Sequence, residues 1–418
     1  MSHPLLDLPK AFRAGRSAGI TSVCSAHPVV IEAGLRHGLA VGQPVLIEAT
    51  CNQVNQDGGY TGMTPADFRD FVLSIAGRVG YPTDRIILGG DHLGPNPWKH
   101  LAAEEAMAKA EVMIAAFAAA GFTKLHLDTS MGCLGEPIAL ADAVTAERAA
   151  RLAAVAEVHR NGAYDPVYII GTEVPVPGGA VHGLDHLQIT RPDAVATTYD
   201  IHRMAFDAAG QSDAFSRVIG LVVQPGVEFG HDDVIHYAPE MAKDLSATLG
   251  GFTSFVFEAH STDYQTVAGL RQLVSDGFSI LKVGPWLTFA LREALYGLDA
   301  IADVLDGHAP RNQLMLAMES VMQAAPANWA KYYQGDATNL WVQRHFSYSD
   351  RIRYYWPDPA AAVAVADLRD RLAGRSIPAP VLRQYLPNLP QSENLDFDSI
   401  LLQSVEAVLA IYHAAIHG

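Results

Sequence analysis

The chain has 418 residues, of which 49% are hydrophobic and 18% charged, a composition that fits a compact globular protein and excludes an intrinsically disordered one. Its formal net charge of -16, without clusters of Lys and Arg, argues against a nucleic-acid partner but allows a phosphorylated small molecule. Three widely spaced cysteines form no CxxC motif, which is typical of a reducing cytosol and excludes a cysteine-based zinc site.

The amino terminus has scattered charges and no apolar core of the kind found in a signal peptide. We also expect no membrane span, because no run approaches the roughly 18 apolar residues that one requires. These features predict a cytoplasmic protein.

Short apolar runs ending in polar or Gly-rich turns alternate eight times with alanine-rich helical stretches. The runs are predicted strands at 20–25, 44–50, 85–90, 124–128, 167–173, 217–224, 252–260 and 278–284. Helices are predicted at 29–37, 65–79, 101–120 and 140–161. Eight β/α units with near-continuously apolar strands predict a (β/α)8 TIM barrel over residues 1–300. The alternative, a doubly wound open sheet, would carry a GxGxxG motif after an early strand, and none is present.

Beyond the barrel the alternation stops. Residues 301–418 are predicted to form a mainly helical extension that folds onto the barrel, with a final helix at 398–415. Within it, residues 329–357 are dense in aromatic and charged side chains.

Polar residues gather where the predicted strands end, which is the position of the active site in a TIM barrel. They are Glu48, Asp91, His92, His126, Asp128, Glu173, Glu228, His231, Glu258, His260 and Lys282. Asp91-His92 is the first candidate catalytic pair, although Asp91 could instead cap the following helix. Asp128, Glu48 and Glu173 could equally order loops by accepting backbone hydrogen bonds.

A divalent metal site is one chemistry that these residues allow. Glu258 and His260 are two apart on a strand and therefore point to the same side. His92, His260 and His231 could supply three neutral nitrogens to one ion and leave a position open for a substrate oxygen. Each single histidine is more often a packing residue, so the joint positioning carries the prediction. Lys282 could instead form a Schiff base, a role that is largely redundant beside a metal.

Two segments could bind a phosphate group. Gly178 and Gly179, and Ser261 and Thr262 after the seventh strand, could place N–H and hydroxyl donors around it, although the glycines could also be a plain turn. In the extension, Arg351 or Arg353 could lie over the barrel mouth as a bidentate anion clamp, or simply face solvent.

The sequence resembles the GatZ/KbaZ family across essentially the whole chain. The resemblance rests on Gly89-Gly90-Asp91-His92-Leu93-Gly94-Pro95-Asn96, Gly171-Thr172-Glu173-Val174-Pro175, Phe257-Glu258-Ala259-His260-Ser261-Thr262-Asp263 and Phe346-Ser347-Tyr348-Ser349-Asp350-Arg351-Ile352-Arg353-Tyr354-Tyr355-Trp356-Pro357. It implies either the non-catalytic subunit of a class II tagatose-bisphosphate aldolase or an enzyme of ketohexose 6-phosphate 4-epimerisation.

The barrel is also similar, more distantly, to class II aldolases. That likeness implies proton transfer for Asp91 and zinc ligation for His92, with later zinc ligands at His231 and His260. The match at His231 is loose, so Glu173 or Glu258 could replace it. Lys282-Val283-Gly284-Pro285-Trp286 stands where the aldolases carry their last phosphate motif.

We therefore expect an isomerase, a Zn²⁺-dependent 4-epimerase that interconverts D-tagatose 6-phosphate and D-fructose 6-phosphate in carbohydrate catabolism by retro-aldol chemistry. Its catalytic residues would be Asp91, Glu173 and Asp128. The alternatives are a stabilising subunit of a separate class II aldolase, and an aldolase in its own right. The expected partner is a sugar phosphate, and an aldolase subunit and further copies of the chain are candidate partners. A kinase is not supported, since no GxxxxGK[ST] loop is present.

Overall fold

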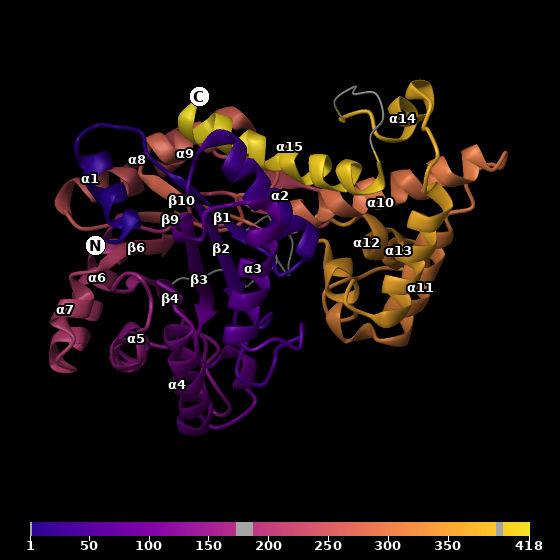
Figure 1. Ribbon diagram of the computed structural model, residues 1–418. Helices are drawn as coiled ribbons and strands as arrows, with labels where there is room; N and C mark the ends of the chain where they lie inside the picture. The colour runs from indigo at the N-terminus through magenta and orange to yellow at the C-terminus, as the bar shows by residue number, and fades with distance from the viewer. Residues whose placement is uncertain (1, 173–186, 390–395) are drawn as a thin grey trace.

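Eight parallel strands close into a barrel in the computed structural model, which describes residues 2–172, 187–389 and 396–418 (Figure 1). The order around the barrel is β1-β10-β9-β6-β5-β4-β3-β2. These strands are β1 (Ile20–Cys24), β2 (Val45–Thr50), β3 (Ile86–Leu93), β4 (Lys124–Leu127), β5 (Val167–Ile170), β6 (Val218–Val223), β9 (Val256–Ala259) and β10 (Phe278–Val283). The predicted (β/α)8 barrel is confirmed.

Helices follow the strands and cover the outside of the barrel. They are α2 (Pro28–Val41), α3 (Pro65–Val79), α4 (Ala103–Ala119), α5 (Asp142–His159), α6 (Pro192–Ala208), α7 (Ser212–Phe215), α8 (Pro239–Thr248), α9 (Val267–Ser275) and α10 (Pro285–Leu305). Local signals fix several ends: Thr64 and Asp67 form a capping box at α3, and Gly80 ends it in the left-handed conformation.

Two features near the site differ from the sequence-based expectation. β3 continues to Leu93, so Asp91 and His92 lie within the strand instead of after it, and the pairing with β4 is irregular between Gly90 and Leu93. The segment after β6, for which no strand was predicted, forms a small antiparallel hairpin of β7 (Glu228–Phe229) and β8 (Val234–Ile235).

The amino-terminal segment closes one end of the barrel. It consists of a 3-10 helix, η1 (Pro4–Leu6), and α1 (Asp7–Arg13), and it inserts Leu5 and Leu8 into an apolar cluster inside the barrel. The barrel residues of that cluster are Leu46, Ile87, Val167, Ile169, Ile219, Val222, Val256 and Ile280. Polar chemistry is therefore confined to the other end, where the strands finish.

The remaining helices form the extension. They are α11 (Gln313–Ala324), α12 (Ala337–Phe346), α13 (Pro359–Leu372), α14 (Ala379–Tyr385) and α15 (Phe397–His417), with a 3-10 turn, η7 (Arg351–Tyr355), between α12 and α13. Figure 1 shows α11 to α13 on one side of α10 and α14 on the other, away from the barrel, while α15 returns along the barrel. α10 runs through the predicted boundary at residue 300 and contacts helices on both sides of it.

α15 is long and apolar enough, by length and composition, to cross a membrane, with a mean hydropathy of 1.5 in its most apolar window. The expectation of no membrane span was based on a run of apolar residues, whereas this helix meets a mean-hydropathy criterion although polar residues interrupt it. Half of that window is buried, and α15 packs against α2, α9 and α10, so its apolar composition is explained by packing.

Candidate active site

The end of β3 places two polar side chains inside the barrel. Asp91 and His92 are both almost fully buried, and His92 adopts a left-handed backbone conformation with φ of 50°. Gly89 allows β3 to lie close to the Glu48 side chain on β2, since a Cβ atom at position 89 would lie 2.7 Å from Cγ of Glu48. Strain at a buried polar residue is a common feature of active sites.

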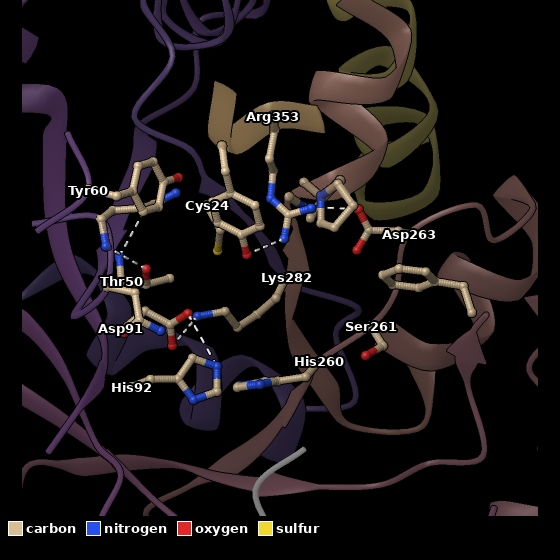
Figure 2. A pocket seen from close by; sticks show the side chains of 17 residues that line it. Cys24, Thr50, Tyr60, Asp91, His92, His260, Ser261, Asp263, Lys282 and Arg353 are labelled. Carbon is tan, nitrogen blue, oxygen red and sulfur yellow. Dashed lines mark hydrogen bonds and ion pairs between the residues drawn. The ribbon is translucent and has the colours of Figure 1, made fainter. Parts of the chain in front are cut away.

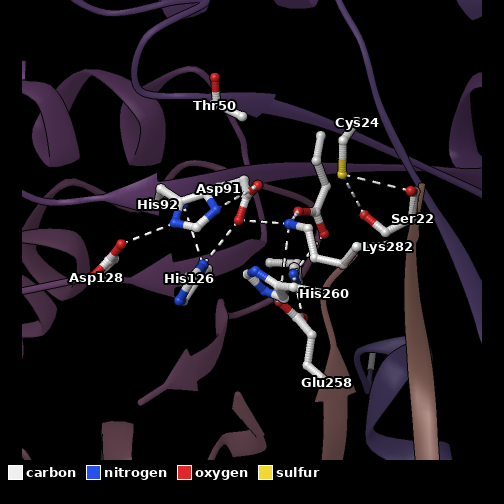
Figure 3. Close-up of polar contacts among 12 residues, drawn as sticks. Ser22, Cys24, Thr50, Asp91, His92, His126, Asp128, Glu258, His260 and Lys282 are labelled. Carbon is white, nitrogen blue, oxygen red and sulfur yellow. Dashed lines mark hydrogen bonds and ion pairs between the residues drawn. The ribbon is translucent and has the colours of Figure 1, made fainter. Parts of the chain in front are cut away.

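Two buried lysines link three carboxylates across the barrel. Nζ of Lys124 lies 2.6 Å from both Glu48 Oε1 and Glu258 Oε2. Nζ of Lys282 lies 2.6 Å from Glu48 Oε2 and 2.5 Å from Asp91 Oδ1 (Figure 3). Buried charges are stable only when they are paired in this way.

Three histidines form the next layer. The ring centroids of His92, His126 and His260 lie 5.0 to 5.3 Å apart. Each ring contacts a carboxylate at 2.9 Å: His92 Nδ1 with Asp128 Oδ2, His126 Nδ1 with Asp91 Oδ1, and His260 Nε2 with Glu258 Oε1 (Figure 3). Such carboxylate contacts fix the orientation of imidazole ligands at metal sites.

Asp91, His126, Glu258 and His260 could hold a metal ion, because one ligand atom from each lies within 4.8 Å of the others. Nε2 of His126 is buried and has no hydrogen-bond partner among the described residues. The donor set therefore fits a divalent ion. Cys24, Glu48 and Asp91 form a second such group, which contains no histidine.

The predicted metal ligands are only partly brought together. His260 and Glu258 belong to the group, whereas His92 lies beside it and bonds to Asp128. The hairpin carries His231 away from it, to Ser347 of the extension, whose Oγ lies 3.0 Å from His231 Nδ1. His126 takes the remaining position. Its two-residue spacing from Asp128 was visible in the sequence, but the direction of its side chain was not.

The electrostatics keep these groups in defined charge states. Burial by itself would raise the pKa of Asp91, but His92, the Lys282 ammonium and the His126 hydrogen bond outweigh it and hold that pKa well below its usual range. Burial would lower the pKa of Lys282, but Asp91 and Glu48 outweigh it and raise that pKa well above its usual range. A lysine that stays protonated is a poor nucleophile, which disfavours the Schiff-base reading.

For His260, unlike Asp91 and Lys282, burial determines the direction of the pKa shift. Burial lowers the pKa of His260 to about 3, although the Glu258 contact acts against it. The ring is therefore neutral near pH 7. With Nε2 bonded to Glu258, its other nitrogen can offer a lone pair.

A cavity opens above this layer at the ends of the strands (Figure 2). The barrel and its loops supply most of its wall, and the extension supplies Arg353 and Tyr354. The lining residues are Cys24, Thr50, Asn52, Gln53, Tyr60, Asp91, His92, Phe229, His260, Ser261, Asp263, Lys282, Val283, Gly284, Pro285, Arg353 and Tyr354.

The predicted phosphate-binding residues divide between the cavity and its surroundings. Ser261, Lys282 and Arg353 line the cavity. Thr262 is fully buried and donates its hydroxyl hydrogen to Lys282 O at 2.6 Å. The Arg351 guanidinium stacks 3.4 Å from the Tyr332 ring centroid, outside the cavity lining.

Three predicted residues, Glu173, Gly178 and Gly179, lie outside the described residues. Conversely, Tyr60, Asp263 and Tyr354 line the cavity but were not singled out from the sequence. Asp263 and Tyr354 both belong to the runs quoted for the family resemblance, so membership of those motifs was the available signal.

Fold and site together define a TIM-barrel enzyme with a buried acid and imidazole cluster at the carboxyl ends of its strands. The chain belongs to the GatZ/KbaZ-like family of D-tagatose-1,6-bisphosphate aldolase subunits, whose model matches residues 5–417. The resemblance stated from the sequence is confirmed.

Two relatives are similar over nearly their whole length. A D-tagatose 6-phosphate 4-epimerase from Agrobacterium fabrum is 55% identical over 419 residues, covering 99% of each chain. The crystal structure of a probable tagatose 6 phosphate kinase from Sinorhizobium meliloti is 58% identical with a TM-score of 0.86, covering 95% of this chain and 100% of that one. The relationship to an epimerase confirms the predicted class of enzyme, an isomerase.

A more distant structure shares the fold alone. The glycerol complex of the fructuronate-tagaturonate epimerase UxaE from Cohnella laeviribosi is 11% identical with a TM-score of 0.52, covering 98% of this chain and 85% of that one.

Proposed function

We propose that the protein is a metal-dependent 4-epimerase that interconverts D-tagatose 6-phosphate and D-fructose 6-phosphate. The observation that carries the proposal is the buried group of Asp91, His126, Glu258 and His260, of which Asp91 and His260 line an open cavity. The substrate is proposed from the 55% identical relative, which is named as a D-tagatose 6-phosphate 4-epimerase.

Charge balance supports a divalent ion in this group. Glu48, Asp91, Asp128 and Glu258 are buried carboxylates, and Lys124 and Lys282 are buried ammoniums. Counted over these six groups alone, four negative and two positive charges leave two negative charges, which one divalent ion would balance. We assign its ligands to His126, Glu258 and His260, which leaves a position open for substrate.

An ion bound there, most simply Zn²⁺, would supply Lewis-acid polarisation of a sugar oxygen. Asp91 lies beside it and is the proposed acid/base for the proton of the C4 hydroxyl. Inversion at C4 needs no redox cofactor if the C3–C4 bond is broken, the aldehyde fragment turns, and the bond forms again. The Lys282 ammonium lines the same cavity and would stabilise the negative charge that develops on cleavage.

The other proposed contacts surround this centre. Asp128 holds His92 through the 2.9 Å contact, so its proposed role is to orient that ring. Arg353 is the proposed phosphate contact, since its guanidinium lines the cavity. Glu173 stays a proposed catalytic residue on the strength of the sequence alone.

The direct test is to incubate the purified chain alone with fructose 6-phosphate and a divalent ion and to assay for tagatose 6-phosphate. We expect interconversion that stops when a chelator is added. The family description as an aldolase subunit favours the second candidate function, a stabilising partner. No turnover by the chain alone, together with activation of an added class II aldolase, would establish that alternative.

We further propose that the protein acts in the cytoplasm, as its cysteine content suggests, in the catabolism of tagatose-type sugars. Association with an aldolase subunit or with further copies of the chain is part of this proposal. Size-exclusion chromatography with light scattering, with and without an aldolase, tests it.

A further inference from the structure

The proposed reaction places a demand on the cavity that the barrel alone does not meet. The two C4 epimers differ in the direction in which the C4 oxygen points from the sugar chain. A single fixed acid/base cannot reach that oxygen in both, because proton transfer requires hydrogen-bond distance. A second proton-transfer group is therefore needed elsewhere on the cavity wall.

Tyr354 is positioned to be that group. It lines the cavity from η7 of the extension, a part of the chain remote in sequence from Asp91. Figure 2 shows its neighbour Arg353 on one side of the cavity, with Asp91 and His92 on the other. The Tyr354 hydroxyl oxygen accepts a hydrogen bond from Nη2 of Arg353 at 2.9 Å.

Two guanidinium groups flank the Tyr354 ring and favour its deprotonated form. Their central carbons lie 4.5 Å (Arg353) and 5.1 Å (Arg351) from the ring centroid. Burial would raise the pKa of Tyr354, but Arg353 and Arg351 outweigh it and bring that pKa below the usual tyrosine value. Tyr60, which contacts Tyr354 edge to face, shows the contrast, because burial raises its pKa to about 12.

We propose that Tyr354 is a catalytic proton-transfer residue that serves the C4 oxygen of one epimer, while Asp91 serves the other. The inference rests on the proposed function. It is consistent with Arg353 as phosphate contact, because the phosphate and the C4 oxygen belong to the same three-carbon fragment. A phosphate held by Arg353 would keep C4 near the adjacent Tyr354 hydroxyl.

Protons and electrons balance in each direction of the reaction. Asp91 takes the C4 hydroxyl proton, the C3–C4 bond breaks, and its electron pair moves through C3 to the C2 oxygen, giving an enediolate and an aldehyde. The aldehyde turns about C4–C5, C3 attacks its other face, and the new C4 alkoxide takes the Tyr354 proton. Solvent in the open cavity then carries one proton from Asp91 to Tyr354. No oxidant or reductant is needed.

The test is the half-reaction in the direction of bond formation. Purified protein with a divalent ion is supplied with dihydroxyacetone and D-glyceraldehyde 3-phosphate, and the two ketohexose 6-phosphates are quantified. We expect the unaltered protein to form both. Tyr354→Phe should form one at near its original rate and the other about 100-fold more slowly or less, since a positioned acid/base contributes roughly 10²–10⁴-fold.

The matched control is Tyr348→Phe, which removes a hydroxyl from the same segment. The Tyr348 ring packs against Tyr264 and Phe289 outside the cavity lining. This variant should keep the original product ratio. For interconversion, Tyr354→Phe should lower kcat with KM for fructose 6-phosphate within about threefold, and should lose the alkaline limb of the kcat profile.

The outcomes separate the two levels of the proposal. An unaltered product ratio in Tyr354→Phe, or equal loss of both products, overturns the role of Tyr354. Interconversion without condensation by the unaltered protein overturns the retro-aldol route and with it this inference, while the epimerase function stands. Absence of interconversion overturns the proposed function itself.

Discussion

The ammonium of Lys282, on β10, lies 2.5 Å from Oδ1 of Asp91, on β3. These two strands are not neighbours in the barrel, so the ion pair crosses its interior. Glu48 on β2 contacts the same ammonium at 2.6 Å. The catalytic candidate Asp91 is therefore held by a buried network that depends on the closed barrel.

Replacing Lys282 with Met should destabilise the fold by about 3–5 kcal/mol, because it leaves buried carboxylates without their cation. Urea unfolding with a chelator present measures this without a contribution from bound metal. The double variant Lys282→Met with Glu48→Gln should recover part of the loss, since it also removes one unpaired charge. A loss below about 1 kcal/mol in the single variant would contradict the network.

His126→Gln and His260→Gln should each lose bound divalent metal and activity, because both rings belong to the group that could hold the ion. Elemental analysis of the purified variants gives the metal content per chain. His231→Gln distinguishes this ligand set from the one expected from the sequence. It should retain the metal, since His231 bonds to Ser347. Full metal content in His126→Gln would rule out that residue as a ligand.

Glu228 gives a pH-dependent prediction. Burial raises the pKa of its carboxyl from 4.5 to about 7. The folded protein thus retains a proton that the unfolded chain releases, so the stability contribution of Glu228 falls as pH rises from 4.5 to about 7. Across this window the free energy of unfolding of Glu228→Gln should rise relative to that of the unaltered protein by up to about 3 kcal/mol, at about 1.4 kcal/mol per pH unit. Urea unfolding at several pH values checks it; parallel curves would show that Glu228 does not titrate this way.

The carboxyl-terminal helix is tied to the site by Tyr412, whose hydroxyl donates to Thr262 O at 2.8 Å. Tyr412→Phe should cost about 1–2 kcal/mol, because it leaves a buried carbonyl without its donor. We also expect a lower kcat, because Thr262 follows the cavity residue Ser261. Tyr385→Phe is the control, since that hydroxyl has no hydrogen bond among the described residues. Equal unfolding free energies for the two variants would show that the hydrogen bond from Tyr412 to Thr262 does not stabilise the fold.

Much of the architecture could be predicted from local sequence patterns. Apolar runs bounded by glycine and polar turns marked all eight barrel strands, because a strand buried on both faces needs apolar side chains throughout. The same turns placed Asp91, His92 and His260 at one end of the barrel. Proline at the first helical turn marked α3, whose bounds match the prediction.

The sequence pattern did not show which of these side chains contact one another. His126 lies within a strand run and His231 follows one, but the hairpin of β7 and β8 turns His231 toward the extension, while His126 points into the barrel. Arg351 and Arg353 are two residues apart in a 3-10 helix, where each residue turns the chain by about 120°, so they face different directions. Only Arg353 reaches the cavity.

The order of amino acids by itself determined a parallel barrel and the end at which its polar groups collect. This is because a buried strand is recognised from the apolar residues of that strand alone. Which imidazoles share an ion, which lysine neutralises which acid, and that a tyrosine from the extension enters the cavity were decided only by closure of the barrel. These contacts join segments that are far apart in the sequence, and their geometry depends on side-chain directions that no local pattern records.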